Sequence, residues 1–195
     1  MPVRFLIMAL LLAAPAVAQR SVERPEPVPR MDVQVTYATA QPDAPAGETR
    51  IAFHAASGVF RIDPPAVDGA APVYILSRRG TDRAVMVMES RRGWLELEPG
   101  VTLMRELEVA LSSGRATRQG TGRHANVACT LWRLPEPALG TACISQRGVL
   151  LRRESPGGAV LEATTVDQRE QDVERFVPPA HFRAITSAEL FAPPP

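Results

Sequence analysis

The chain has 195 residues, with 22 basic side chains, 21 acidic side chains and a formal net charge of +1. Such a neutral balance gives no long-range attraction for nucleic acid or anionic membrane surfaces, so we expect neither as a partner. The basic residues are all arginine, which we attribute, with the abundant alanine, proline and glycine, to a GC-rich genome. The length fits one domain.

Residues 1–18 have the three parts of a secretory signal peptide. Arg4 supplies the positive start, 5–14 form an uncharged apolar run, and Ala16-Val17-Ala18 gives the small-x-small pattern that precedes cleavage. The apolar run is shorter than the roughly 20 residues of a membrane span, and no lipid-attachment cysteine follows it. We predict cleavage after Ala18 and export to the periplasm of a Gram-negative bacterium as a soluble protein without a transmembrane segment. A retained N-terminal anchor is the alternative.

Residues 19–30 are predicted to be a linker before the folded domain. Their prolines alternate at positions 25, 27 and 29, a pattern typical of an extended polyproline-type segment with few packing contacts. Residues 191–195 are expected to form a disordered tail. The single folded domain is therefore predicted to span residues 31–190.

The domain begins with short segments that alternate apolar and polar residues, separated by turns. This pattern predicts an antiparallel meander. The expected strands in this half are 31–37, 49–54, 59–62, 73–77, 84–88 and 94–98.

A helix is predicted over residues 101–113. Its apolar residues recur every three or four positions, and Gly114 is well placed to end it. Residues 114–123 are polar and rich in glycine, so we expect a flexible loop. Strands are predicted again at 126–134, 141–144, 148–153 and 159–166. The charged stretch 167–175 is expected to be a solvated connector, followed by a proline-rich corner at 176–182.

Cys129 and Cys143 are the only cysteines, and in an oxidising compartment an even pair is most simply a disulfide. Both lie seven residues from Glu136, so a hairpin centred there places them directly opposite each other, within bridging distance. A redox-active pair is the alternative, but it favours a Cys-x-x-Cys spacing that is absent.

Together these elements predict an α+β fold with about ten strands and one main helix. The segments 128–133 and 141–152 after the central helix, with the ending 176–182, resemble uncharacterised bacterial periplasmic proteins similar in layout to the LolA/LolB-like half-barrel superfamily. The resemblance covers about 31–185. It implies a large curved antiparallel sheet, an open half-barrel, with the main helix packed on its concave side. In relatives of known role the cavity holds lipid acyl chains or other apolar ligands.

No catalytic or metal-binding constellation stands out, so we expect neither enzymatic activity nor a cofactor. His54, His124 and His181 are far apart in sequence and lack metal-ligand spacing, and no Gly-x-Ser-x-Gly elbow occurs. Arginines occur in pairs or near-pairs that could bind an anionic headgroup, although exposed arginines are the more ordinary interpretation. These are Arg78 with Arg79, Arg91 with Arg92, Arg115 with Arg118, and Arg152 with Arg153.

The apolar side chains suggest a pocket between sheet and helix. Methionine lines adaptable pockets well because its side chain is flexible and polarizable. The residues proposed to line the pocket are Met86, Met88, Leu103, Met104, Leu107, Leu111 and Trp132. Ordinary core packing between sheet and helix is the alternative. The leading hypothesis is a periplasmic binding or carrier protein holding a lipid or other apolar ligand. The other is an envelope structural or protein-interaction module without a small ligand.

Overall fold

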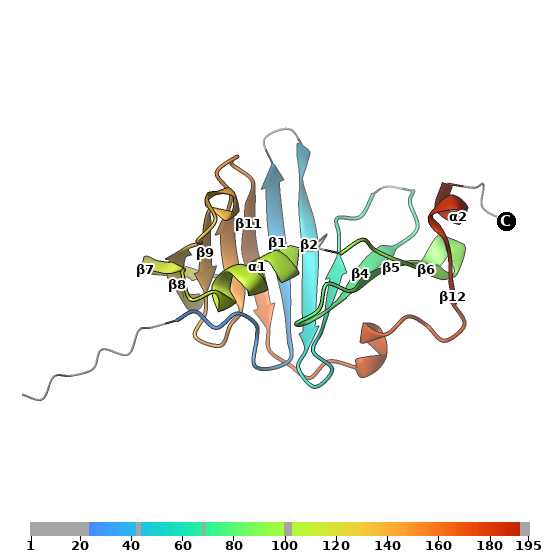
Figure 1. Ribbon diagram of the computed structural model, residues 1–195, viewed down its shortest axis with the longest axis horizontal. Coiled ribbons are helices and arrows are strands. Elements are labelled where there is room, and N and C mark those ends of the chain that lie inside the picture. Colours follow the sequence, from blue (N-terminus) through green and yellow to red (C-terminus); the bar gives the residue numbers. More distant parts are fainter. Residues whose placement is uncertain (1–23, 42–43, 68, 100–102, 192–195) are drawn as a thin grey trace, which may run out of the picture.

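A computed structural model describes residues 24–41, 44–67, 69–99 and 103–191 (Figure 1). The predicted signal peptide, residues 19–23 of the predicted linker and residues 192–195 of the predicted tail lie outside these ranges. Within them, neither α-helix is long and apolar enough to cross a membrane.

One open sheet of twelve strands dominates the structure, in the order β12-β6-β5-β4-β3-β2-β1-β11-β10-β9-β8-β7. The first half contains β1 (Val33–Gln41), β2 (Ala44–His54), β3 (Val59–Asp63), β4 (Val73–Arg78), β5 (Ala84–Met88) and β6 (Gly93–Glu96). The second contains β7 (Thr117–His124), β8 (Val127–Arg133), β9 (Thr141–Ile144), β10 (Leu150–Glu154), β11 (Val160–Asp167) and β12 (Arg183–Ala184). Neighbouring strands are antiparallel, except that β12 runs parallel to β6. The large open antiparallel sheet is thus confirmed, with two strands more than expected.

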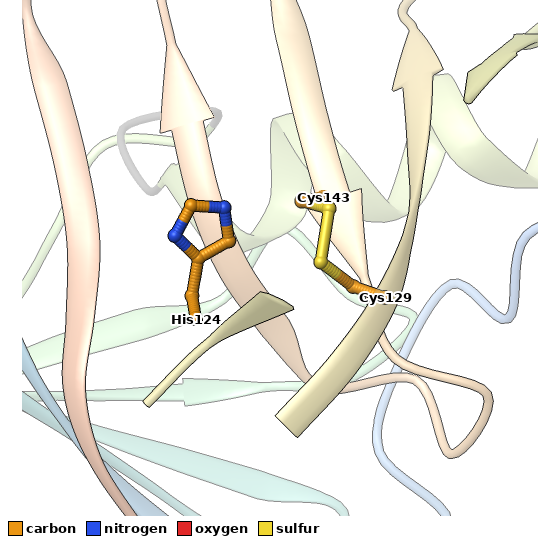
Figure 2. Close-up of side chains that lie close together, drawn as sticks. All are labelled: His124, Cys129 and Cys143. Atoms are coloured by element: carbon orange, nitrogen blue, oxygen red, sulfur yellow. A yellow bond between two sulfur atoms is a disulfide. The ribbon is translucent and has the colours of Figure 1, made fainter. Parts of the chain in front are cut away.

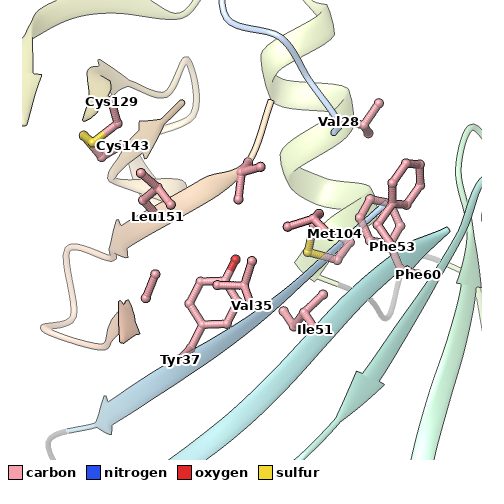
Figure 3. Close-up of a cluster of buried hydrophobic side chains, with 13 residues drawn as sticks. Val28, Val35, Tyr37, Ile51, Phe53, Phe60, Met104, Cys129, Cys143 and Leu151 are labelled. Atoms are coloured by element: carbon pink, nitrogen blue, oxygen red, sulfur yellow. A yellow bond between two sulfur atoms is a disulfide. The ribbon is translucent and has the colours of Figure 1, made fainter. Parts of the chain in front are cut away.

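The helix α1 (Leu103–Ser112) connects the two halves and crosses one face of the sheet (Figure 1). Met104 packs in a core cluster with Val35 and Ile51 of β1 and β2 (Figure 3). One turn later, Leu107 belongs to a second cluster with Trp132 of β8. The apolar stripe of the predicted helix therefore reaches both halves of the sheet, and Gly114, with φ of +70°, follows the helix as expected.

The sheet bends strongly at its β7 end. The Nδ1 atom of His124 on β7 lies 3.0 Å from Oε1 of Glu162 on β11, four strands away in the sheet order. In a flat sheet these strands would be about 19 Å apart, because neighbouring strands are spaced by about 4.8 Å. Strand pairing places both side chains on the face opposite Trp132. At this end the sheet therefore bends away from α1.

Residues 114–123, predicted to be a flexible loop, instead contain most of strand β7. Its sequence, TRQGTGRH, has no apolar side chain and is largely exposed. Its register with β8 runs from Thr117 opposite Arg133 to His124 opposite Val127. The strand is held by its backbone pairing and not by a buried face, so the hydrophobic pattern could not indicate it.

The predicted disulfide between Cys129 and Cys143 is confirmed, with a Cα–Cα distance of 5.5 Å. The predicted register is wrong, however, because Cys143 lies opposite Leu131, and Cys129 is two residues before Leu131 on β8. A short 3-10 helix, Pro137–Leu139, forms the turn and moves the centre of the hairpin away from Glu136. The two cysteines therefore bridge diagonally across the same face.

Both ends of the described chain pack more tightly than the sequence suggested. Val28 of the predicted linker is only 1% exposed and belongs to the main core cluster, and Arg30 N–H donates to the carbonyl of Arg147. In the predicted solvated connector, Gln171 is buried. Phe176 begins the proline-rich corner and is also buried. The chain then forms β12 and the short helix α2 (Ser187–Phe191), neither of which was predicted.

The close contact of the N-terminal segment with the turn after β9 gives a testable prediction. Gly148 has φ of +81°, and a Cβ atom built on it would lie 2.0 Å from the carbonyl oxygen of Val28. We expect Gly148→Ala to lower the free energy of unfolding by about 2 kcal/mol or more, since it adds backbone strain and a clash with backbone. Gly157→Ala is the matched control, because its nearest contact is 4.0 Å away. Equal urea midpoints for the two variants would contradict this.

Candidate functional site

The predicted pocket residues do not line one common pocket but lie in different surroundings. Leu107, Leu111 and Trp132 are buried together in one core cluster, and Trp132 also borders a pocket of about 500 Å³ beside Arg24 and Glu26. Met86 is half-buried and Met88 is buried, both on β5. The side chain of Leu103 is not among those described. Of the predicted residues whose side chains are described, Met104 alone lines a pocket between α1 and the sheet.

This pocket has a volume of about 230 Å³ and lies where the first turn of α1 approaches the sheet. Strand pairing places the apolar side chains of Ile51 and Ile62 next to each other, and Leu161 opposite Thr39. The described residues that line the pocket are Thr39, Ala40, Thr49, Ile51, Ile62, Met104, Arg153, Ala159, Val160 and Leu161. The site is thus mostly apolar, with two threonines and one cation.

Arg153 is the one charged residue among those described in this lining, and its surroundings differ from those of its neighbour Arg152. Successive strand residues point to opposite faces, so Arg152 lies on the other side of β10. There its guanidinium donates to Glu162 and Glu154, each at 2.9 Å. The buried Nε atom of Arg153, in contrast, has no hydrogen-bond partner within the described chain.

The electrostatics of Arg153 follow from this position. Burial lowers the pKa of its guanidinium, and the negative charge of Glu106 on α1 acts in the opposite direction. An arginine nevertheless keeps its charge in proteins because its unperturbed pKa lies far above neutral pH. The pocket therefore contains a permanent cation that is partly removed from water and incompletely compensated, which is a costly arrangement without an anion.

A second side-chain cluster surrounds the disulfide, on the opposite face of the sheet. The ligand atoms of His124, Cys129 and Cys143 lie within 4.8 Å of one another, and the Nε2 edge of the imidazole is turned toward the sulfurs (Figure 2). Zinc binding by cysteine requires thiolates, however, and here both sulfurs are joined to each other. The arrangement packs His124 against a disulfide and offers one nitrogen ligand. His54, hydrogen-bonded to Ser57, and His181, packed edge-on against Phe182, lie elsewhere.

A third feature, a groove of about 320 Å³, lies on the face of the first half of the sheet that Phe176 covers. Trp94, Val177 and Pro178 contribute apolar surface, with Arg78 and Arg83 at its edge. Sequence reasoning missed this groove because residues 176–182 were expected to be a proline-rich corner without regular structure. It also missed Arg153 as a pocket residue, for which the Arg152-Arg153 pair was the sole signal.

The unequal surroundings of the two arginines predict opposite effects on stability. Arg153→Met removes a poorly compensated cation while keeping an unbranched side chain, so we expect the free energy of unfolding to rise by about 1 kcal/mol. Arg152→Met removes two partly exposed ion pairs and should lower it by about 0.5–1 kcal/mol. Urea unfolding of both variants measures this. A loss of stability in Arg153→Met equal to that in Arg152→Met would show that Arg153 is adequately paired.

No protein-family model and no curated protein matches the chain. Solved structures do resemble it. An uncharacterized conserved protein of Thermus thermophilus has a TM-score of 0.55 at 10% identity, over 80% of this chain and 90% of that one. A chain of the Pseudomonas aeruginosa MucA/MucB complex has a TM-score of 0.50 at 12% identity. The match covers 77% of this chain but 56% of that one, so this chain spans little more than half its length.

A LolA superfamily protein from Nitrosomonas europaea is also similar, with a TM-score of 0.41 at 14% identity, over 80% of this chain and 93% of that one. A protein with this name among the similar structures agrees with the resemblance in layout stated from the sequence. At identities this low, likeness to solved structures concerns the fold alone. The chain thus shares its fold with the Thermus thermophilus protein.

Proposed function

We propose that the protein is an exported, non-enzymatic binding or carrier module that holds an apolar ligand between α1 and the sheet. The observation that carries the proposal is the pocket of about 230 Å³ at the first turn of α1. The second turn of the same helix is packed solidly against Trp132. An interface that is dense at one end and hollow at the other suits a binding site.

The chemistry of the lining favours binding over catalysis. Among the described residues that line the pocket, the polar groups are threonine hydroxyls, backbone and one guanidinium, with no histidine, carboxylate or cysteine. General acid–base or nucleophilic catalysis needs a titratable group or an activated nucleophile within reach of the substrate. A lipid or a lipidated partner needs apolar surface, which Ile51, Ile62, Met104 and Leu161 supply.

Export to the periplasm is part of the proposal and has two supports. One is the signal-peptide pattern of residues 1–18. The other is the disulfide between Cys129 and Cys143, a bond typical of proteins in oxidising compartments.

The second candidate function, an interaction module of the envelope, is favoured by the groove beside Phe176. Val177 at its edge is 50% exposed, and an apolar surface next to arginines suits a peptide segment of a partner protein. The solved structure of a MucA/MucB complex, similar in fold, is an assembly of two proteins. A pull-down from envelope extracts with and without Val177→Asp tests this function, and a partner lost in the variant is the expected result.

The binding proposal is tested by native mass spectrometry and lipid extraction on protein purified from the envelope of its own bacterium. We expect an apolar molecule to co-purify at a fixed stoichiometry. Protein that is free of ligand in every preparation would contradict the proposal.

A variant that fills the pocket tests whether that ligand binds there. Ile62→Trp should fill much of the pocket and lower the fraction of ligand-bound protein at least tenfold, because the large ring occupies the space of the ligand. Ile75→Trp is the matched control, since Ile75 is the cross-strand neighbour of Ile62 and is also half-buried, but does not line the pocket. Equal ligand occupancy in the two variants would place the ligand elsewhere.

A further inference from the structure

The residues that line the pocket also indicate the charge of the ligand. Arg153 contributes a positive charge to a lining in which none of the described residues is acidic. Its buried Nε–H has no acceptor among the described residues, and Glu106, the acid that influences its pKa, is exposed on α1. An uncompensated cation beside an apolar cavity is the arrangement that an anionic group on a ligand would complete.

We infer that the ligand is a single-chain amphiphile with a carboxylate head, which pairs with the guanidinium of Arg153 while the tail lies along Ile51, Ile62, Met104 and Leu161. This inference rests on the proposed binding function and names the class of its ligand. The planar guanidinium presents its N–H groups in a fork that fits a carboxylate with two parallel hydrogen bonds.

The size of the pocket limits the tail. If each heavy atom of a ligand takes somewhat less than the roughly 30 Å³ that a water molecule occupies in the liquid, a pocket of about 230 Å³ holds about eight to ten heavy atoms. An eight-carbon carboxylate has about that size. A longer chain would extend through the open side of the pocket, and a diacyl lipid would not enter with both chains.

The charge of the site favours a carboxylate over a phosphate monoester. The described lining of the pocket offers one cation, which a carboxylate neutralises fully. A phosphate monoester carries a charge of about −1.5 to −2 at neutral pH and would leave negative charge against apolar walls. The nearby hydroxyl of Thr39 already donates to the carbonyl of Gly47 at 2.9 Å, so it is engaged within the sheet.

The test compares eight-carbon probes that differ in their heads, by isothermal titration calorimetry on delipidated protein. Octanoate, 1-octanol, octylamine and octyl phosphate are titrated into the unchanged protein, Arg153→Met and Arg152→Met. We expect octanoate to bind the unchanged protein at least tenfold more tightly than octanol, because the charge-assisted pair adds to the same apolar contact. In Arg153→Met the two affinities should agree within about twofold. In Arg152→Met, whose charge lies on the other face, the preference should persist.

The possible failures are distinguishable. Equal affinities of octanoate and octanol for the unchanged protein would overturn the assigned head while leaving an apolar binding site in place. Tighter binding of octylamine or of octyl phosphate than of octanoate would also overturn it. A preference for octanoate that survives in Arg153→Met would place the head elsewhere. Failure of all four probes to bind would contradict the inference and the proposed binding function together.

Discussion

The pairing of β1 with β11 is the contact on which the rest of the structure depends. It matches seven residues of β1, from Gln34 to Ala40, with residues 160–167, more than 110 positions later in the chain. Apart from β12, which pairs with β6, each half of the described protein is a meander of local hairpins, and the pairing of β1 with β11 joins the two meanders into a single sheet. Buried Tyr37 reinforces the join by donating its hydroxyl to the carbonyl of Leu150 at 2.7 Å. Burial raises the pKa of Tyr37, which keeps this donor protonated.

The joined sheet also creates the site. Successive side chains along a strand point to opposite faces of the sheet. The pairing of β1 with β11 determines which side chains of the two halves share a face. Thr39 and Ile51 from one half thereby share a face with Leu161 and Arg153 from the other. Arg152 lies on the opposite face, where its guanidinium donates hydrogen bonds to the carboxylates of Glu162 and Glu154. A register shift of one residue in β10 would move Arg153 to the opposite face and place Arg152 and Glu154 on the side of the pocket.

Hydrophobic patterns in the sequence predicted the helix and the strands that have a buried face. The helix predicted at 101–113 is found at Leu103–Ser112, and the ten expected strands are present, because hydrophobic periodicity reports directly on a buried face. Strand β7 was missed since it has no buried face, and Val28 was missed since its burial depends on a turn that begins at Ser145. The disulfide partners were predictable from the compartment, but their diagonal register depends on the shape of the turn at Pro137–Leu139.

The site was predictable in kind but not in detail, for a related reason. An apolar stripe such as Met104, Leu107 and Leu111 shows which side of a helix is buried, but not how completely its partners fill the space. On β8 and β9, Trp132 and Ala142 complement Leu107 and Leu111 and leave a solid core. Near Met104 the facing residues include Thr39 and Thr49, which are too small to fill the same gap. The helix is thus fixed by its later turns, while flexible Met104 borders the pocket and can adjust to a ligand without moving the sheet.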